Sequence, residues 1–323
     1  MRRREFLGVL SGAAAAWPLA ARAQEGSRIY RLGVMMPSPK IASHITAFFD
    51  ELRVFGFVEG QNLKVDGGGY DLRDEQLPEI AAAMAKFPPD VIFCAAVAHI
   101  RAAQEAIRAV PIVGLATDMI ATGLVKSLAR PSGNITGVSL LSSELDGKRQ
   151  DILIEAVPGA RRMAMLADAN ATAPQHLKTL QDAARARGVE MAIVTARTPE
   201  DISPAMNEIK TSGAAAINAL SGPLLSANRR LVIERAVALR LAAIYEWPEM
   251  AEEGGLIGYG ARLSGIFRQA ARMVVKALRG VKPADIPIEQ PTNFELVINL
   301  KTAQAIGHEV PVGLVLRADK VIE

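Results

Sequence analysis

The chain has 323 residues, of which half are apolar and only 5% are aromatic. That length is too great for one small core and suits two α/β units of about 150 residues each. The composition is typical of a folded protein with an aliphatic core, which excludes an intrinsically disordered chain. No apolar run reaches the roughly 18 residues that a membrane-spanning helix requires, so the sequence predicts a soluble protein.

The first 23 residues have the features of a cleaved export signal. An arginine triplet precedes an alanine-rich apolar stretch at 6–20 and a small-x-small cleavage site at 21–23. The R-R-E-F-L sequence at residues 3–7 is similar to a twin-arginine export motif. We therefore predict export, with a mature chain that begins at Gln24. The alternative is a cytosolic protein with a basic amino terminus.

The basic balance of the chain comes from this amino-terminal segment. The formal net charge is +3, from 37 Lys and Arg against 34 Asp and Glu. The first 23 residues hold four of those arginines and one glutamate, so the remainder has 33 basic and 33 acidic residues. A neutral remainder gives no general attraction to nucleic acid, and we expect no nucleic-acid partner.

Short apolar runs alternate with segments of helical spacing along the whole chain, which is typical of parallel sheets built from βαβ units. The runs occupy residues 29–36, 91–94, 111–115, 135–140, 163–167, 189–194, 214–219, 241–245 and 256–259. A shorter strand is expected at 63–65. This number of strands exceeds one comfortable sheet of about five or six, so we predict two sheets in two lobes.

Helix boundaries are marked by caps and breakers. A helical stretch that starts near residue 45 ends near Gly56, and a second helix is expected over 144–157. A third has one apolar face over 267–278, with Ser264 as its expected N-cap. The breaker-rich stretch at 130–143 marks the expected passage from the first lobe to the second.

Motifs of the common enzyme classes are absent from the sequence. There is no G-x-S-x-G elbow of a serine hydrolase and no H-E-x-x-H zinc motif. The G-K-R sequence at 147–149 lacks the hydroxyl and the upstream glycine of a P-loop. Glycines 255, 258 and 260 suit close packing of backbone rather than dinucleotide binding. We predict a protein that is not an enzyme and has no catalytic residue.

The histidines and the single cysteine also give no metal or cofactor site. His44, His99, His176 and His308 are scattered, with no pair at the spacing of metal ligands. We expect surface or packing roles for them, although His44 and His99 follow strand ends. Cys94 lies in an apolar strand and is expected to be an inert core thiol. No metal and no cofactor are predicted.

A ligand site is expected where the strands end. In open parallel sheets, ligands bind beyond the carboxyl ends of strands, where the following helices present free N–H groups. Such N–H groups suit a carboxylate, and the side chain of Asp118 or Glu246 suits an ammonium, so a small polar ligand such as an amino acid is predicted. Each position serves equally well as a helix cap. The candidate ligand contacts are Ser38, Ala96, Asp118, Asn170, Ser221, Glu246 and Tyr259.

Longer motifs point to one family. Asp118 is followed at 122–138 by T-G-L-V-K-S-L-A-R-P-S-G-N-I-T-G-V, and three further segments fit the same pattern, at 56–62, 290–303 and 316–323. Through these residues the chain resembles the ABC-transporter substrate-binding proteins related to the tryptophan/tyrosine importer type, which have a type I periplasmic-binding fold. The family's usual Asp-Pro-Val is here D-M-I, so the resemblance leaves the identity of the solute open.

The resemblance implies two Rossmann-like α/β lobes with parallel sheets, joined by a three-crossing hinge, with a solute held between them by hinge closure. It further implies a periplasmic, monomeric component of an importer whose partners are an ABC permease and its ATPase. The corresponding division of the chain is an export signal at 1–23, an amino-terminal lobe of 28–138 plus 261–289, and a carboxyl-terminal lobe of 139–260 plus 290–323.

Three other functions are compatible with an α/β chain of this kind. A periplasmic ligand sensor would feed a chemoreceptor or a signalling kinase instead of a permease. A periplasmic hydrolase or oxidoreductase is disfavoured by the missing motifs. A transcriptional regulator is disfavoured by the export signal and by the lack of an amino-terminal helix-turn-helix.

Overall fold

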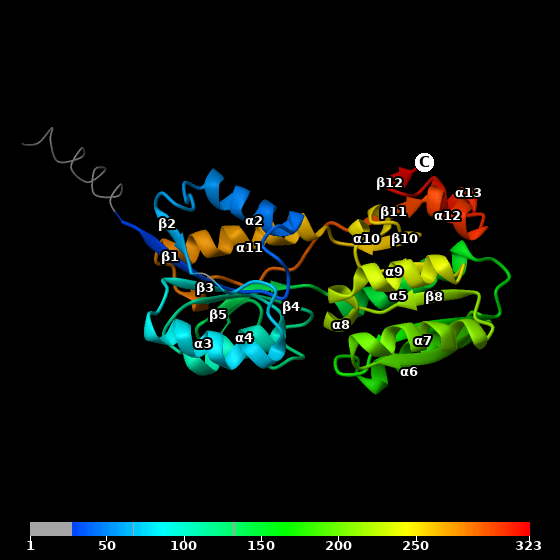
Figure 1. The fold of residues 1–323 in the computed structure, drawn as a ribbon, viewed down its shortest axis with the longest axis horizontal. Helices are drawn as coiled ribbons and strands as arrows, with labels where there is room; N and C mark the ends of the chain where they lie inside the picture. Colours follow the sequence, from blue (N-terminus) through cyan, green and yellow to red (C-terminus); the bar gives the residue numbers. More distant parts are fainter. Residues whose placement is uncertain (1–27, 67, 132) are drawn as a thin grey trace, which may run out of the picture.

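The computed structural model describes residues 28–66, 68–131 and 133–323, which form two α/β lobes lying side by side (Figure 1). The export signal predicted at 1–23 lies outside these residues. Within the described ranges, none of the helices is long and apolar enough to span a bilayer.

The amino-terminal lobe is built on a five-stranded sheet that is parallel throughout, in the order β2-β1-β3-β4-β5. Its strands are β1 (Tyr30–Met35), β2 (Leu63–Val65), β3 (Val91–Ala95), β4 (Ile112–Ala116) and β5 (Ile135–Ser139). All five coincide with predicted strands. The helical segments of this lobe are α2 (Ser43–Val54), η1 (Asp74–Gln76), α3 (Leu77–Lys86), α4 (Val97–Ala106), α11 (Leu263–Leu278) and η2 (Pro283–Asp285).

The helices α2 and α11 pack together on one face of this sheet, and α3 and α4 pack together on the other (Figure 1). On the first face Phe48, Phe93 and Phe267 form a buried aromatic group, with the rings of Phe48 and Phe93 stacked at 4.3 Å. The apolar stripes on α2 and α11 face this group, because burial of apolar surface against the sheet stabilises the fold.

The carboxyl-terminal lobe is built on a seven-stranded sheet in the order β12-β11-β10-β9-β8-β6-β7. Its strands are β6 (Arg162–Asp168), β7 (Glu190–Ala196), β8 (Ala216–Ala219), β9 (Ala242–Tyr245), β10 (Ile257–Gly260), β11 (Glu295–Asn299) and β12 (Lys320–Ile322). Its helices are α5 (Ser142–Ala156), α6 (Pro174–Ala186), α7 (Pro199–Thr211), α8 (Pro223–Ala227), α9 (Arg229–Ala238), α10 (Pro248–Glu252), α12 (Leu300–Ile306) and α13 (Val312–Val315).

Two strands of this sheet are not predicted by the apolar runs. The apolar core of β11 is only three residues long, and β12 is a three-residue strand with an exposed first residue. The pair β10–β11 is antiparallel, whereas the other neighbours run parallel. The two-lobed α/β prediction is confirmed, and the second sheet contains this one antiparallel pair.

The chain passes between the two sheets three times: from β5 into α5, from β10 into α11, and from η2 into β11. Because β5 and β10 run parallel to the other βα strands of their sheets, the carboxyl ends of both sheets face these crossings. The candidate ligand contacts therefore lie at the two facing edges.

At the second crossing, a carboxylate of the carboxyl-terminal lobe caps a helix of the amino-terminal lobe. Helix α11 begins at Leu263, so Ser264 lies inside its first turn and the prediction of Ser264 as N-cap is wrong. The N–H of Leu263 donates instead to Glu249 Oε1 of α10, at 2.9 Å. A carboxylate at a helix N-terminus satisfies a free N–H group and interacts favourably with the helix dipole.

Candidate functional site

A buried arginine links three of the candidate contacts. Arg149 of α5 is 1% exposed. Its Nε donates to the carbonyl oxygen of Tyr259 at 2.8 Å, its Nη1 to Ser221 Oγ at 2.9 Å, and its Nη2 to the carbonyl oxygen of Glu246 at 3.4 Å. One guanidinium therefore binds the carboxyl ends of β8, β9 and β10 at once.

The charge of Arg149 is balanced by Asp146, one turn earlier on α5. The pair is almost fully buried, with Nη1 of Arg149 2.7 Å from Oδ1 of Asp146. The other oxygen of Asp146 lies 2.9 Å from Nε2 of His176 on α6, a residue that is partly exposed. Ser221 also donates to Asp146 Oδ1, through its backbone N–H at 3.3 Å. Buried charges of this kind persist only when they are paired and hydrogen-bonded.

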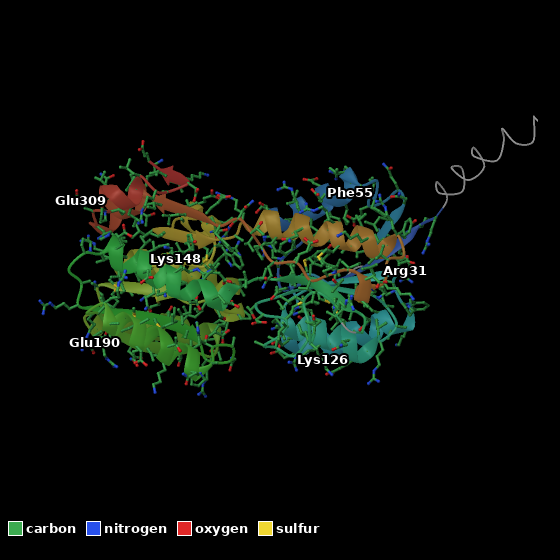
Figure 2. All side chains as sticks on the ribbon, turned by 180° about the vertical axis from the view of Figure 1, so that it is seen from behind. Arg31, Phe55, Lys126, Lys148, Glu190 and Glu309 are labelled. Carbon is green, nitrogen blue, oxygen red and sulfur yellow. The ribbon has the colours of Figure 1, made fainter. Side chains whose placement is uncertain are left out.

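The sequence carries a signal for this cluster that the search for motifs misses. A helical stripe that starts from Ala156 and Leu153 continues back through Arg149, Asp146 and Ser142, and all five of these residues are buried. The neighbouring Lys148 is exposed on the outer side of the helix (Figure 2). Charged residues that continue an apolar stripe predict a buried polar network.

Glu246 is the second buried carboxylate at this edge. It is 5% exposed, and its Oε2 accepts a hydrogen bond from Ser226 Oγ at 3.0 Å. Burial raises the pKa of this carboxyl, and the nearby Arg149 guanidinium offsets part of that effect. A buried carboxyl at the end of a strand can accept a hydrogen bond from, or pair with, a cationic group of a ligand.

Two glycines of β10 allow this edge to form. A Cβ atom at Gly258 would lie 2.8 Å from Cα of Pro248, and one at Gly260 would collide with the carbonyl oxygen of Glu246. The predicted role of these glycines in close backbone packing is confirmed. Only glycine lets β10 approach the segment that follows β9 this closely.

In the amino-terminal lobe the candidate contacts lie at the carboxyl ends of β1, β3 and β4. Ser38 and Ala96 are partly buried, and Ala96 is the residue before α4. Asp118 caps its own turn, since its Oδ1 accepts from the N–H groups of Ile120 at 2.8 Å and Ala121 at 2.9 Å. The capping role that the sequence left open is therefore filled by one oxygen of Asp118.

Asn170 is set apart from the Arg149 cluster. It is exposed, and its Nδ2 donates to the carbonyl oxygen of Arg197, beyond the edge strand β7. The buried Asp168 beside it accepts from the N–H groups of Asn170 at 2.9 Å and Leu224 at 3.0 Å, which joins the end of β6 to α8. The structure thus gathers Ser221, Glu246 and Tyr259 and leaves Asn170 at the margin.

Two histidines and the cysteine are buried in the amino-terminal lobe. His44 packs on Phe267, with 4.5 Å between the ring centroids, and Cys94 is fully buried, which raises the pKa of its thiol. His99 is buried, and burial lowers its pKa. Across residues 28–66, 68–131 and 133–323, no group of three or more His, Cys, Asp or Glu is placed to hold a metal ion.

We expect His44 to make the protein sensitive to acid. Burial, assisted by the Arg229 guanidinium, lowers the pKa of His44 from 6.5 to about 4. Between these pH values the His44 ring binds a proton more readily in the unfolded chain than in the folded one. The contribution of neutral His44 to the free energy of unfolding is therefore fully present above pH 6.5 and is lost as the pH falls through 4. The loss should reach roughly 3 kcal/mol, and urea unfolding at pH 7 and pH 4 measures it. A His44→Leu variant should lose much less over the same range; an equal loss would contradict the assignment.

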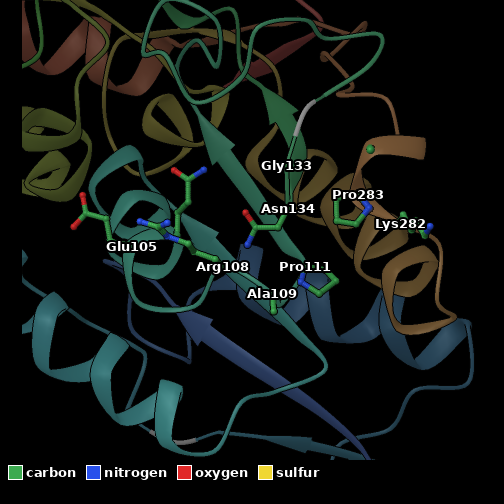
Figure 3. A pocket seen from close by; sticks show the side chains of 10 residues that line it. Glu105, Arg108, Ala109, Pro111, Gly133, Asn134, Lys282 and Pro283 are labelled. Atoms are coloured by element: carbon green, nitrogen blue, oxygen red, sulfur yellow. The ribbon is translucent and has the colours of Figure 1, made fainter.

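A large surface hollow lies away from all of these residues. It has a volume of about 650 Å3 and is lined by Arg108, Pro111, Asn134 and Lys282, among others (Figure 3). Pro111 and Asn134 directly precede β4 and β5, so the hollow is at the amino-terminal edge of the first sheet, opposite the crossings. Ligands of parallel α/β sheets bind at the other edge, and we therefore place the candidate site there.

The family model for ABC transporter substrate binding proteins matches residues 33–322. The chain belongs to this family. The match spans both lobes and all three crossings, so the resemblance that the sequence motifs indicate is confirmed. Members of this family are binding proteins, in agreement with the prediction that this protein is not an enzyme.

Similar proteins include one curated relative and several solved structures. The "Tyrosine-binding protein" of Clostridioides difficile (strain R20291) is 24% identical over 283 residues, which cover 84% of this chain and 79% of the relative. A conserved domain protein of Vibrio cholerae has a TM-score of 0.83 at 23% identity, over 91% of this chain and all of that one. An ABC domain from Streptococcus pneumonia in complex with L-Trp has a TM-score of 0.80 at 20% identity, with the same coverage. These similarities establish the type I periplasmic-binding fold.

Proposed function

We propose that this protein is the solute-binding component of an ABC importer and that its solute is an amino acid held between the two lobes. The observation that carries the proposal is the Arg149 cluster, which gathers Ser221, Glu246 and Tyr259 at the edge that faces the amino-terminal lobe. An edge with a buried carboxyl and N–H groups at helix starts suits a ligand that bears both an ammonium and a carboxylate.

The relatives narrow the choice of first ligand. One curated relative is a tyrosine-binding protein and one solved structure holds L-Trp, so L-tyrosine and L-tryptophan are the first ligands to test. The half-buried Tyr259 ring lies 6.5 Å from the Phe294 ring at the third crossing, which gives an aromatic surface beside the cluster. An aromatic side chain of a ligand packs well against such a surface.

In this proposal the two lobes close on the solute by movement at the segments that join them. The segments that move as units are 28–138 plus 261–289 and 139–260 plus 290–323, and the three crossings between them serve as the hinge. Ligand contacts from both lobes form only in the closed state, so ligand binding shifts the population toward closure. The closed form, as a monomer, docks on a permease whose ATPase drives import. Export by the twin-arginine signal places the protein in the periplasm, where the solute arrives.

A binding experiment tests the proposal. We expect L-tyrosine or L-tryptophan, at 100 times its dissociation constant, to stabilise the protein by about 2.7 kcal/mol and to raise its melting temperature by a few degrees. Tyramine lacks the carboxylate and 3-(4-hydroxyphenyl)propionate lacks the ammonium, so neither should give the shift. A shift with all four compounds would contradict amino-acid recognition. Recovery of a chemically altered ligand would contradict a pure binding function.

A further inference from the structure

The Arg149 guanidinium makes more hydrogen bonds than its ion pair with Asp146 requires. Pairing with Asp146 requires only one of its nitrogens, at 2.7 Å. The same nitrogen, Nη1, also donates to Ser221, and Nη2 and Nε donate to Glu246 and Tyr259, so the guanidinium reaches the ends of three strands that lie 72, 97 and 110 residues away in the sequence. Two of these contacts are to backbone carbonyl oxygens, so they fix the course of the chain and not only a side chain.

The same guanidinium also touches two of the three crossings. Its Nη1 donates to the carbonyl oxygen of Ser142 at 3.1 Å, where the first crossing enters α5. Its Nε donates to the carbonyl oxygen of Tyr259, the residue before Gly260, where the second crossing begins. The planar fork of arginine directs five N–H groups in fixed directions, and the two on Nη1 are shared among Ser142, Asp146 and Ser221. A lysine ammonium is a point charge on a flexible stem and cannot reproduce this arrangement.

We propose that Arg149 is a positioning residue, which fixes the ends of β8, β9 and β10 and thereby sets the ligand-facing geometry of the carboxyl-terminal lobe. It acts through Ser221, Glu246 and Tyr259 and does not itself contact the ligand. The inference rests on the proposed function for its effect on affinity, but the fixing of the strand ends is a property of the protein alone. Loss of the fork should loosen all three strand ends together, because one group holds them.

The test is an Arg149→Lys variant, which keeps the positive charge beside Asp146 and removes the fork. The matched control is Arg162→Lys at the opposite end of the same lobe, where Arg162 also pairs with a carboxylate, Glu190, and donates to a backbone carbonyl oxygen, that of Ser212. Both variants are studied under conditions in which circular dichroism and urea unfolding show more than about 99% folded protein. Reduced stability alone cannot then change the measured affinity.

Two readouts decide the outcome. Amide hydrogen exchange should become faster at residues 220–222, 245–247 and 258–260 in Arg149→Lys and remain unchanged there in Arg162→Lys. The dissociation constant for L-tyrosine or L-tryptophan should rise at least about tenfold in Arg149→Lys only. Unchanged exchange at these strand ends overturns the inference, as does an unchanged dissociation constant. If the unmodified protein binds neither amino acid, the ligand assignment fails, while hydrogen exchange still decides whether Arg149 fixes the strand ends.

Discussion

An Arg149→Met variant should lose about 3–5 kcal/mol of its free energy of unfolding. Methionine fills much of the space of the arginine stem, so the expected loss comes from the charge and the hydrogen bonds. Without the guanidinium, the carboxylate of Asp146 stays buried, and the carbonyl oxygens of Glu246 and Tyr259 lose a donor. Urea unfolding followed by circular dichroism measures the change.

A second substitution, at Asp146, separates the cost of leaving a carboxylate buried without its partner from the cost of the lost hydrogen bonds. In the double variant Asp146→Asn/Arg149→Met the buried carboxylate is gone, so the loss should be clearly smaller than the sum of the two single losses. Residues in direct contact show such coupling, and the two side chains are 2.7 Å apart. Additive losses would contradict the assignment of Asp146 as the ion-pair partner.

A Gly137→Ala variant should lose roughly 3–5 kcal/mol, because it combines backbone strain with overpacking. Gly137 has φ +145°, which side-chain-bearing residues rarely adopt. It is paired with Gly114 across β4 and β5, and a Cβ atom at 137 would lie 2.6 Å from the backbone nitrogen of Gly114 and collide with its carbonyl oxygen. The neighbour is backbone in the middle of a sheet, so it cannot give way without breaking strand pairing.

Gly265→Ala is the matched control for this prediction. Gly265 lies inside α11 with open space around its Cα, so an added methyl group meets nothing. Because alanine is the better helix former, this variant should gain about 0.5–1 kcal/mol. The same unfolding experiment measures both variants. A Gly137→Ala protein as stable as the unmodified one would show that the two strands are farther apart than the structure places them.

Ten of the twelve described strands, the two lobes and the family were predictable from the sequence, because their signals lie in contiguous residues. A buried parallel strand must be apolar on both faces, so β1, β3 to β6 and β8 to β10 stand out as short apolar runs. The edge strand β7 is partly exposed, but it also contains an apolar run. The apolar pattern does not predict β11 and β12, whose apolar stretches are too short to stand out as runs. The ligand-facing edge was also predictable, since a βα connection always leaves its loop at the carboxyl end of the strand.

The grouping of side chains at that edge depends on contacts between distant parts of the chain. Sequence alone does not distinguish Asp118, whose Oδ1 caps a turn, from Glu246, which is buried beside Arg149. Nor does it show that Asn170 turns outward to Arg197. Whether a polar residue at a strand end caps a helix or faces a ligand is set by neighbours from other elements, and the local sequence does not contain them.

By itself, then, the sequence determines the alternation of strands and helices, the division into two sheets and the family, because apolar periodicity and long motifs are properties of contiguous residues. The tertiary structure alone decides which groups Arg149 contacts, that Glu249 of one lobe caps α11 of the other, and that Ser221, Glu246 and Tyr259 share one guanidinium. The physical reason is that a buried charge is tolerable only with its partners in place, and these partners come together only when the sheet has formed.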